Sequence, residues 1–501
     1  MRVRARRRGR QPDRPSRVRR GDRLPRRLLG RLALAGVQRR GLLHQRRRRA
    51  SPRERALLEG VKASNDLARS TGSEAADPVY DATYLRWALG ILCAVYVVNF
   101  FDRQILAILL QSIKRDLQLT DVQLGLLSGT AFGLFYATLG IPIARLADRV
   151  SRKGVIAVCL ALWSAMTVLC GTAARFESLF LYRIGVGIGE AGGSPPAHSL
   201  ISDYFPPERR ATALAVFALG VPFGLLLGFL VGGWLDETVG WRMAFLIAGA
   251  PGLALSLVVV WTLREPPRGL SEGLEASGGP APSLTEAMRY LWETPSFRHV
   301  AAGAALNAFS AYSVLTWAPA FLIRAHGMGT AEAGAWLALV VGVVGAVGNY
   351  LGGVLGDAWA LREIRSRLWL PAITIASGLP FAFVIFTTTD QAVALAALAA
   401  SMFVGMMCQA PTFAAVQFLA PLRMRATASA VLLFATNIVG LGVGPAATGA
   451  LSDALAPEYG AASIGYALLA GSLVLVWAGL HFFLAAKTFG ADVERARLAA
   501  I

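Results

Sequence analysis

Apolar segments recur along the chain from Tyr84 to Lys487, separated by short polar or charged connections. Each segment is close to the roughly 20 residues that an α-helix needs to cross a bilayer. Because a backbone inside lipid must satisfy its own hydrogen bonds, the pattern predicts an all-α membrane protein with twelve transmembrane helices. The predicted spans are 84–112, 121–144, 154–174, 177–203, 211–235, 242–264, 297–323, 331–356, 367–388, 391–420, 426–452 and 461–487.

Composition and loop charge extend this picture. The chain is 55% hydrophobic and only 16% charged, which is too apolar for an ordinary soluble protein. Alternate loops differ in basic residues, with fifteen in one set and five in the other. Since Lys and Arg are retained on the cytoplasmic side, we expect both termini in the cytoplasm and a multi-pass protein of the inner membrane.

The charge pattern also predicts five regions. They are an Arg-rich, disordered extension over 1–80, six helices over 81–264, a cytoplasmic linker over 265–296, six helices over 297–487 and a cytoplasmic tail over 488–501. The formal net charge of +19 resides in residues 1–55, which hold 22 Arg. Without a basic and aromatic pattern for base stacking, we expect no nucleic-acid partner. Translation of an upstream stretch remains an alternative origin for residues 1–60.

An internal repeat relates the two sets of six helices. Asp148 in "ARLADRVSRK" and Asp357 in "GVLGD" lie 209 positions apart, and "RATA" recurs 215 positions apart at Arg210 and Arg425. An even number of helices separates the copies, so the two bundles have the same topology and form parallel repeats. Transporters commonly build one central site between two such repeats.

A glycine-rich run in the fourth span invites two interpretations. "GIGEAG", from Gly187 to Gly192, matches the fingerprint of a dinucleotide-binding loop. That loop needs a preceding strand within an α/β unit, whereas the flanks here are apolar helices. We therefore interpret the glycines as helix-packing surface, with Pro195 and Pro196 bending or unwinding the helix. No cofactor is expected, and the four cysteines at unrelated spacings predict no metal site or disulfide.

The loop "LADRVSRK" resembles the signature loop of the major facilitator superfamily, although Ala144 and Ser151 stand where that signature has Gly. "NFFDRQILAILL", "GEAGGSPPAHSLISDYFPPERRA", "GWRMAF" and "NIVGLGVGPAATGALSD" are similar to the spinster-like subfamily, whose animal members move lysolipids and sphingosine phosphate. The resemblance implies a major facilitator fold that works by alternating access. It also implies a cytoplasmic gate formed by Asp148, Arg149, Arg152, Lys153 and Asp357. We expect Asp148 to cap a helix or pair with a base, and the basic residues to hold the loop at the anionic leaflet.

Four charges inside the predicted spans need a reason, because ionisable groups in hydrocarbon are costly. Glu190 and Arg183 share one face of the fourth span, and Asp102 and Arg103 are adjacent in the first. The resemblance implies that both spans line a central cavity. We expect Asp102 and Glu190 to take up and release protons, with Arg103 and Arg183 as their charge partners. A static ion-pair network that only fixes packing is the alternative, and His198 is either a relay or a helix-end histidine.

The second set of helices is chemically different, since it carries neutral polar residues instead of charges. They are expected to contact substrate or to bridge helices, and the candidates are Asn307, Tyr312, Thr316, Trp317, Asn349, Gln409 and Asn437. No catalytic nucleophile or metal-ligand set is present in the sequence, so the chain is not expected to be an enzyme.

These observations favour a monomeric secondary transporter with protons as its coupling ion. Its expected substrate is an amphiphilic or organic anion such as a lysolipid or a molecule like sphingosine phosphate. Two alternatives stay open. One is a proton-linked carrier of small organic acids, sugar acids or drugs, and the other is a lipid-binding membrane receptor that does not transport.

Overall fold

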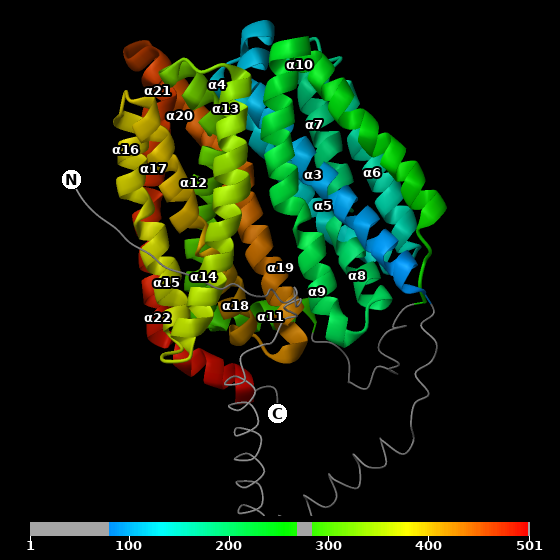
Figure 1. Cartoon of the computed structure of the whole chain (residues 1–501). Helices are drawn as coiled ribbons and strands as arrows, with labels where there is room; N and C mark the ends of the chain where they lie inside the picture. The colour runs from blue at the N-terminus through cyan, green and yellow to red at the C-terminus, as the bar shows by residue number, and fades with distance from the viewer. Residues whose placement is uncertain (1–79, 268–282, 499–501) are drawn as a thin grey trace, which may run out of the picture. The chain divides into compact units, whose positions relative to one another are not determined.

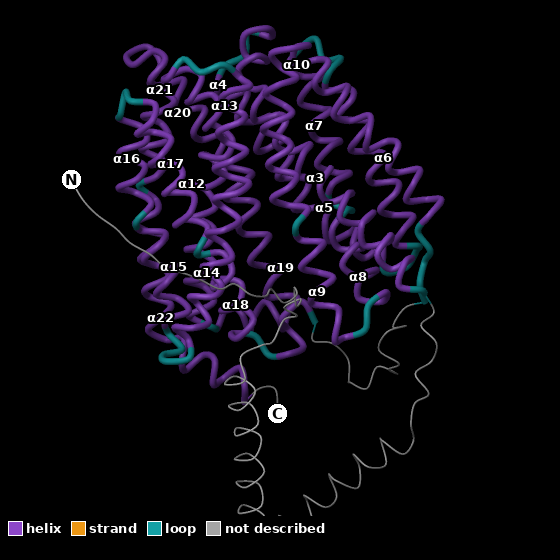
Figure 2. Tube along the Cα trace, in the orientation of Figure 1, coloured by secondary structure: helices purple, strands orange, loops and turns teal. Residues whose placement is uncertain are grey.

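The computed structural model describes residues 80–267 and 283–498, so the predicted extension over 1–80 lies almost wholly outside the described residues. Every regular element in the described residues is helical (Figures 1 and 2). The first half of the fold comprises α3 (Ala82–Leu117), α4 (Asp121–Gly125), η1 (Leu126–Thr130), α5 (Ala131–Ala147), α6 (Arg152–Cys170), α7 (Phe176–Glu190), α8 (Ser194–Tyr204), α9 (Pro207–Ala218) and α10 (Gly220–Thr262).

The second half follows α11 (Leu284–Glu293), a short helix that precedes the seventh span. It comprises α12 (Pro295–His326), α13 (Thr330–Leu337), η2 (Ala338–Val344), α14 (Gly345–Ala360), α15 (Ser366–Ala376), α16 (Gly378–Thr387), α17 (Gln391–Met406), α18 (Gln409–Leu419), η3 (Leu422–Met424), α19 (Arg425–Thr436), η4 (Asn437–Val443), α20 (Gly444–Tyr459), η5 (Gly460–Ala462), α21 (Ser463–Ser472) and α22 (Val474–Leu498).

The twelve predicted spans are all present as helices. Nine continuous helical stretches of the described residues are long and apolar enough to cross a membrane. Two of these stretches each contain two spans, because the chain turns at Gly240, with φ of 80°, and at Gly460, with φ of 56°. The remaining span is the fourth, which is divided into α7 and α8, each too short to cross a membrane alone.

Each half has a core cluster of its own, and a third cluster of buried residues is shared by the two halves along the seam where they meet. In the first half α10 packs along α3 and α6, and in the second half α12 packs along α22. Between the halves α4 packs on α20, and α10 packs on α13. We call the end of the spans where α4 and α13 begin the Asp121 face, and the opposite end, where α5 ends, the Asp148 face (Figure 1).

Four spans at the seam are interrupted along their length. The second, eighth and eleventh spans contain the π-helical segments η1, η2 and η4, and the fifth is divided between α9 and α10 at Leu219. A π-helical turn inserts a residue into the hydrogen-bond ladder and often marks a functional bend. The three π-helical segments lie where the halves contact each other, whereas the break at Leu219 lies within the first half.

Two regions differ from what the loop pattern led us to expect. The stretch predicted as a linker, 265–296, contains α11, whose N-cap Ser283 and Glu286 form a reciprocal capping box. The predicted tail, 488–501, continues α22 as helix to Leu498. Buried Ala287 and Leu291 anchor α11 in the core of the second half. Capping and amphipathic packing thus order part of what composition alone favoured as loop.

Candidate functional site

The fourth span positions the candidate site by ending its first helical segment at Glu190. Residues 191–193 form a turn, and α8 starts at Ser194. A Cβ at Gly187 would lie 2.7 Å from the carbonyl oxygen of Phe132, and one at Gly189 would lie 2.7 Å from the backbone nitrogen of Trp163. The glycines therefore allow α7 to approach α5 and α6 closely, as the packing interpretation predicts.

Arg103 of α3 and Glu190 of α7 form the central ion pair of the site. Arg103 Nε donates to Glu190 Oε2 at 2.5 Å, and the side-chain exposures are 12% and 0%. The Arg103 guanidinium also lies over three rings, 4.8 Å from the centroid of Phe100, 4.9 Å from Phe132 and 4.5 Å from Tyr136. Ring faces attract a cation, so this shell stabilises Arg103 in a setting with little water.

Asp102 lies one residue away but belongs to a different environment. It is fully buried, and its Oδ2 accepts a hydrogen bond from Thr167 of α6 at 3.3 Å. The Trp163 and Asn99 side chains interact with Asp102 and Glu190, respectively, but neither Asp102 Oδ1 nor Glu190 Oε1 accepts a well-formed hydrogen bond within the described part of the chain. Buried carboxylate oxygens without donors are costly, so protonation would relieve both positions.

Arg183 shares this buried region without forming a close ion pair to any described acid. It is 2% exposed, and its guanidinium lies 5.3 Å from the same Phe132 ring that Arg103 contacts. Electrostatic interactions link it to both Asp102 and Glu190. The four charges that the sequence singled out therefore lie in one region of the first half.

Tyr312 is the candidate from the second half that reaches the four charges. It packs against the hydrophobic cluster that contains Phe132 and Tyr136, and it interacts electrostatically with Arg103. By contrast, Trp317 is fully buried and donates its indole N–H to the Pro445 carbonyl, and Thr316 is 7% exposed.

The remaining candidates lie apart from the four charges. Asn307 donates to the Cys408 sulfur, whereas Asn349 and Gln409 are exposed and Asn437 is half-buried. His198 contacts the Ser194 carbonyl oxygen and the Phe217 ring. Within the described residues, no hydrogen bond or ion pair joins any of these five to the four charges.

The predicted gate loop at the Asp148 face makes its strongest contacts inside the first half. Arg152 donates to Asp203, to Ser199 at 2.9 Å and to Glu265 at 2.7 Å, and it is 1% exposed. The expectation that Arg152 holds the loop at the lipid surface is therefore wrong, because its side chain is buried where three spans end.

The other members of the gate loop are more exposed. Lys153 donates to the carbonyl oxygens of Leu263 and Val260, and Arg149 is exposed. Asp148 ends α5, where its backbone N–H bonds to the Ala144 carbonyl oxygen. In the second half, Asp357 pairs with Arg367 at 3.2 Å, so this ion pair also stays within one half.

Glu265 receives several of these donors outside the spans. Burial by itself disfavours its charged form. The Lys153 backbone N–H, the Arg152 guanidinium and the Ser151 hydroxyl outweigh that effect and hold the pKa of Glu265 below its ordinary value. The ionised carboxylate thus fastens the start of α6 to the chain that leaves α10.

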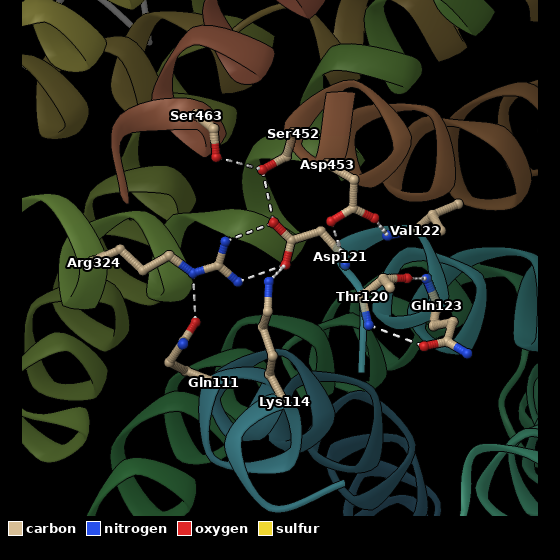
Figure 3. A network of polar contacts seen from close by, with 10 residues as sticks. All are labelled: Gln111, Lys114, Thr120, Asp121, Val122, Gln123, Arg324, Ser452, Asp453 and Ser463. Atoms are coloured by element: carbon tan, nitrogen blue, oxygen red, sulfur yellow. Dashed lines mark hydrogen bonds and ion pairs between the residues drawn. The ribbon is translucent and has the colours of Figure 1, made fainter. Parts of the chain in front are cut away.

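Sequence reasoning missed a polar network that joins the halves at the Asp121 face (Figure 3). Asp121 accepts two hydrogen bonds from Arg324 at 2.7 Å, one from Lys114 at 2.5 Å and one from Ser452 at 2.7 Å. Lys114 and Arg324 are two of the five basic residues in the less basic set of loops, and loop charge alone does not indicate a network. The repeat offset offered no signal, because Asp121 corresponds to Thr330, which cannot form an ion pair.

The contacts between halves are unevenly distributed along the spans. Close packing across the seam involves α3, α4, α5, η1 and α10 with α12, α13, η2, η4 and α20, from the Asp121 face to mid-span. At the Asp148 face, the described helices α8, α9, α14, α18 and α19 pack closely only within their own half. Among the described residues, close packing between the halves is therefore concentrated at the Asp121 face.

Comparison with known proteins places this arrangement in a family. The model of the Major Facilitator Superfamily matches residues 92–445. The chain is 37% identical to an MFS-type efflux pump of Mycolicibacterium smegmatis, over 82% of this chain and 95% of that protein. It is 27% identical to the sphingosine-1-phosphate transporter SPNS2 of Danio rerio, over 82% of this chain and 85% of that one.

A solved structure agrees with the sequence relatives. A bacterial homologue of the human lysosomal transporter Spinster, in an inward-facing and unoccupied conformation, superposes with a TM-score of 0.76 at 32% identity. The match covers 82% of this chain and 99% of that one. The chain therefore belongs to the Major Facilitator Superfamily and is a multi-pass membrane transporter of the spinster-like type.

Proposed function

We propose that this transporter moves an amphiphilic organic anion, such as a lysolipid or a molecule like sphingosine phosphate, and couples that movement to protons through Glu190 and Asp102. The observation that carries the proposal is the Arg103–Glu190 ion pair, which combines a buried base, a carboxylate with one unused oxygen and an aromatic shell. An anionic head group and Glu190 would compete for the same guanidinium.

The competition suggests how substrate and proton are linked. When Glu190 holds Arg103, the guanidinium is neutralised and has little attraction for an anion. When a proton from solution binds Glu190, the carboxyl group becomes neutral and Arg103 is free to pair with the substrate's phosphate or carboxylate. Departure of the substrate would leave Arg103 unpaired, which favours release of the proton and return of Glu190.

Asp102 is proposed as a second proton site with a different role. Its hydroxyl partner Thr167 lies on α6, and it interacts electrostatically with Arg183 and not with a close ion-pair partner. The protonation state of Asp102 would determine how strongly its carboxyl group attracts the Arg183 guanidinium. The two carboxylates are close enough to interact, so they would titrate as a coupled pair.

The aromatic rings around Arg103 favour an amphiphile over a small sugar acid as the substrate. Phe100, Phe132 and Tyr136 surround Arg103, and Tyr96 and Tyr312 belong to the same hydrophobic cluster. A small hydrophilic acid would gain little from these rings, whereas a molecule with an apolar tail would bury surface against them. The sugar-acid and drug alternatives are nevertheless the right comparison substrates, since a sugar acid supplies an anionic group for Arg103 and a cationic drug does not.

The orientation of the chain is also part of the proposal. We propose that the Asp148 face is cytoplasmic, with both termini on that side of the inner membrane, because the basic loop residues gather there. The face at which the halves pack most closely, the Asp121 face, would then be on the opposite side of the membrane. Labelling of Arg149→Cys by an impermeant thiol reagent in inverted, but not right-side-out, membrane vesicles would support this orientation, and the reverse result would refute it.

The test is uptake by proteoliposomes of a labelled lysolipid, a sugar acid and a cationic drug, each with and without an imposed pH gradient. The wild type is compared with Glu190→Gln, Asp102→Asn and a matched control, Glu177→Gln, which changes an exposed carboxylate on the same helix. We expect gradient-dependent lysolipid movement that both site variants lose and the control keeps.

The outcomes of this transport assay distinguish the competing hypotheses. Gradient-driven transport that survives in both site variants would overturn the proton assignment. Movement of the sugar acid or the drug in place of the lysolipid would replace the substrate class. Saturable lysolipid binding without movement of any solute would favour the receptor alternative.

A further inference from the structure

We propose that two carboxylates, Asp453 and Glu237, act as a reciprocal latch that closes the Asp121 face. Each carboxylate ends a span of one half and hydrogen-bonds to the backbone at the start of a span of the other half. The latch holds the state in which the halves meet at this face, and it must release when the transporter opens there. The inference requires only a transporter of this fold, so it is independent of the proposed substrate and of proton coupling.

Asp453 lies near the end of the eleventh span and caps the second. Its Oδ1 accepts from the Asp121 N–H at 2.9 Å, and its Oδ2 accepts from the Val122 N–H at 2.8 Å (Figure 3). These are the first two N–H groups of the continuous helix Asp121–Ala147, and they have no partner within that helix. The N-cap residue Thr120 accepts the next N–H, from Gln123. The second half therefore accepts two of these three N–H groups, and the first half accepts one.

Glu237 makes the corresponding contact between the fifth and eighth spans. Its Oε1 accepts from the Ala331 N–H at 2.8 Å, at the start of the helix Thr330–Ala360. The N-cap residue of that helix is Gly329, which has no side chain to accept a hydrogen bond. The carboxylate from the opposite half therefore supplies the cap that the local sequence lacks.

The two contacts are related by the internal repeat. Ala331 stands 209 positions after Val122, the same offset that separates Asp148 from Asp357, and Asp453 stands 216 positions after Glu237. A close backbone approach accompanies each contact, at Gly233 beside Thr330 and at Gly449 beside Asp121. These glycines are also 216 positions apart, so both caps and both close crossings repeat.

The two sides of the latch differ in strength because their surroundings differ. The Asp453 contact is partly buried and adjoins the Asp121 network, which also binds Arg324 and Ser452 of the second half. The Glu237 contact is exposed, and its neighbour Asp236 interacts both with Ser112 of its own half and with Thr330 of the other. Water competes for an exposed carboxylate, so the Asp453 side should contribute more to closure.

Both contacts end spans that are irregular farther along. The second, eighth and eleventh spans bend at η1, η2 and η4, and the fifth is broken at Leu219. Release of a cap at one end would therefore let that end of the span move about its own irregular segment. The latch and the four irregular segments together describe how this face opens without unfolding any helix.

The test measures the distance between two spin labels across the Asp121 face by double electron–electron resonance in lipid nanodiscs. Spin labels are placed at Ala174→Cys in the first half and Glu458→Cys in the second, both exposed, after replacement of the four native cysteines. We expect the ratio of open to closed protein to rise about tenfold in Asp453→Asn and about threefold in Glu237→Gln, from loss of hydrogen bonds to a charged group. The double variant should combine both effects.

The matched control is Asp116→Asn, which removes an ion pair to Arg242 at the same face but within the first half. It should leave the distance distribution unchanged. A double variant with the distribution of this control would overturn the proposal.

A second measurement covers the case in which the closed state dominates the distance data. The rate of thiol labelling at Thr448→Cys follows the open fraction, because Thr448 is 2% exposed and lies on α20 beside Gly449. We expect labelling to accelerate in the order Glu237→Gln, Asp453→Asn, double variant. Equal rates in all of them and in Asp116→Asn would contradict the latch, and elution as a monodisperse peak shows that each variant is folded.

Discussion

The two halves share a topology but differ in chemistry. The first half buries Asp102, Arg183 and Glu190 inside its spans and half-buries Arg103, whereas the second half offers neutral polar groups such as Asn307 and Tyr312. A repeat that only needed to pack would have no reason to keep four charges in one copy. We therefore propose that both halves take part in the motion and that the first half supplies the charges that act in transport.

The largest expected effect comes from removing the acid of the central ion pair. Glu190→Gln leaves Arg103 buried without its counter-charge, and it removes the proposed proton acceptor. We expect gradient-driven uptake to fall by about a hundredfold, from loss of a charged hydrogen bond and of coupling. Initial rates in proteoliposomes check this, and equal loss in Glu177→Gln would show that the effect is unspecific.

The base of the pair should respond next. Arg103→Lys keeps the positive charge but loses the planar guanidinium that stacks on Phe132 and Tyr136. We expect the substrate concentration for half-maximal uptake to rise about tenfold, with a smaller change in maximal rate. Arg175→Lys, at an exposed position of the first half, is the control, and unchanged half-saturation in Arg103→Lys would argue that the substrate does not meet this guanidinium.

Asp102 is expected to modulate coupling and not substrate affinity. In Asp102→Asn the Thr167 hydroxyl can still bond to the amide oxygen, so packing is largely kept. We expect the stimulation of uptake by a pH gradient to drop about tenfold, whereas uptake without a gradient changes little. Retention of the full stimulation would leave Asp102 with a packing role, which is the static alternative.

A change in the neutral half should have the smallest effect on transport. Tyr312→Phe removes one hydroxyl near Arg103 and keeps the ring in the hydrophobic cluster. We expect at most about a threefold change in uptake, the size of one ordinary hydrogen bond. A loss as large as that of Glu190→Gln would break the division between the halves.

We expect some charges in the first half to stabilise the fold without acting in transport, and Glu265 is one of them. Glu265→Gln should lower thermal stability by about 1 kcal/mol at neutral pH and leave gradient coupling intact. Because the folded state holds the pKa of Glu265 below its ordinary value of 4.5, the stabilisation is present above that pH. It is lost as the pH falls through the folded-state pKa. Melting temperatures of wild type and variant should therefore converge in acid, and a constant difference would contradict the assignment.

The sequence predicted the fold, and it singled out the four charges that the structure brings together, for clear physical reasons. Runs of apolar residues and loop charge define twelve spans, and a charge inside such a run stands out, as Glu190 and Asp102 do. It did not predict that Arg152 is buried, since its partners Asp203 and Glu265 are 51 and 113 positions away. The cap of Asp453 on Asp121 escaped for the same reason, because it depends on how two distant spans cross.

Proton movement driven by substrate tests the central claim most directly. A pH-sensitive dye is trapped in proteoliposomes, and lysolipid is added outside without any imposed gradient. The account predicts a change of internal pH in wild type and in Glu177→Gln, and none in Glu190→Gln. The same pH change in Glu190→Gln as in wild type would contradict the proposal that this carboxylate carries the coupled proton.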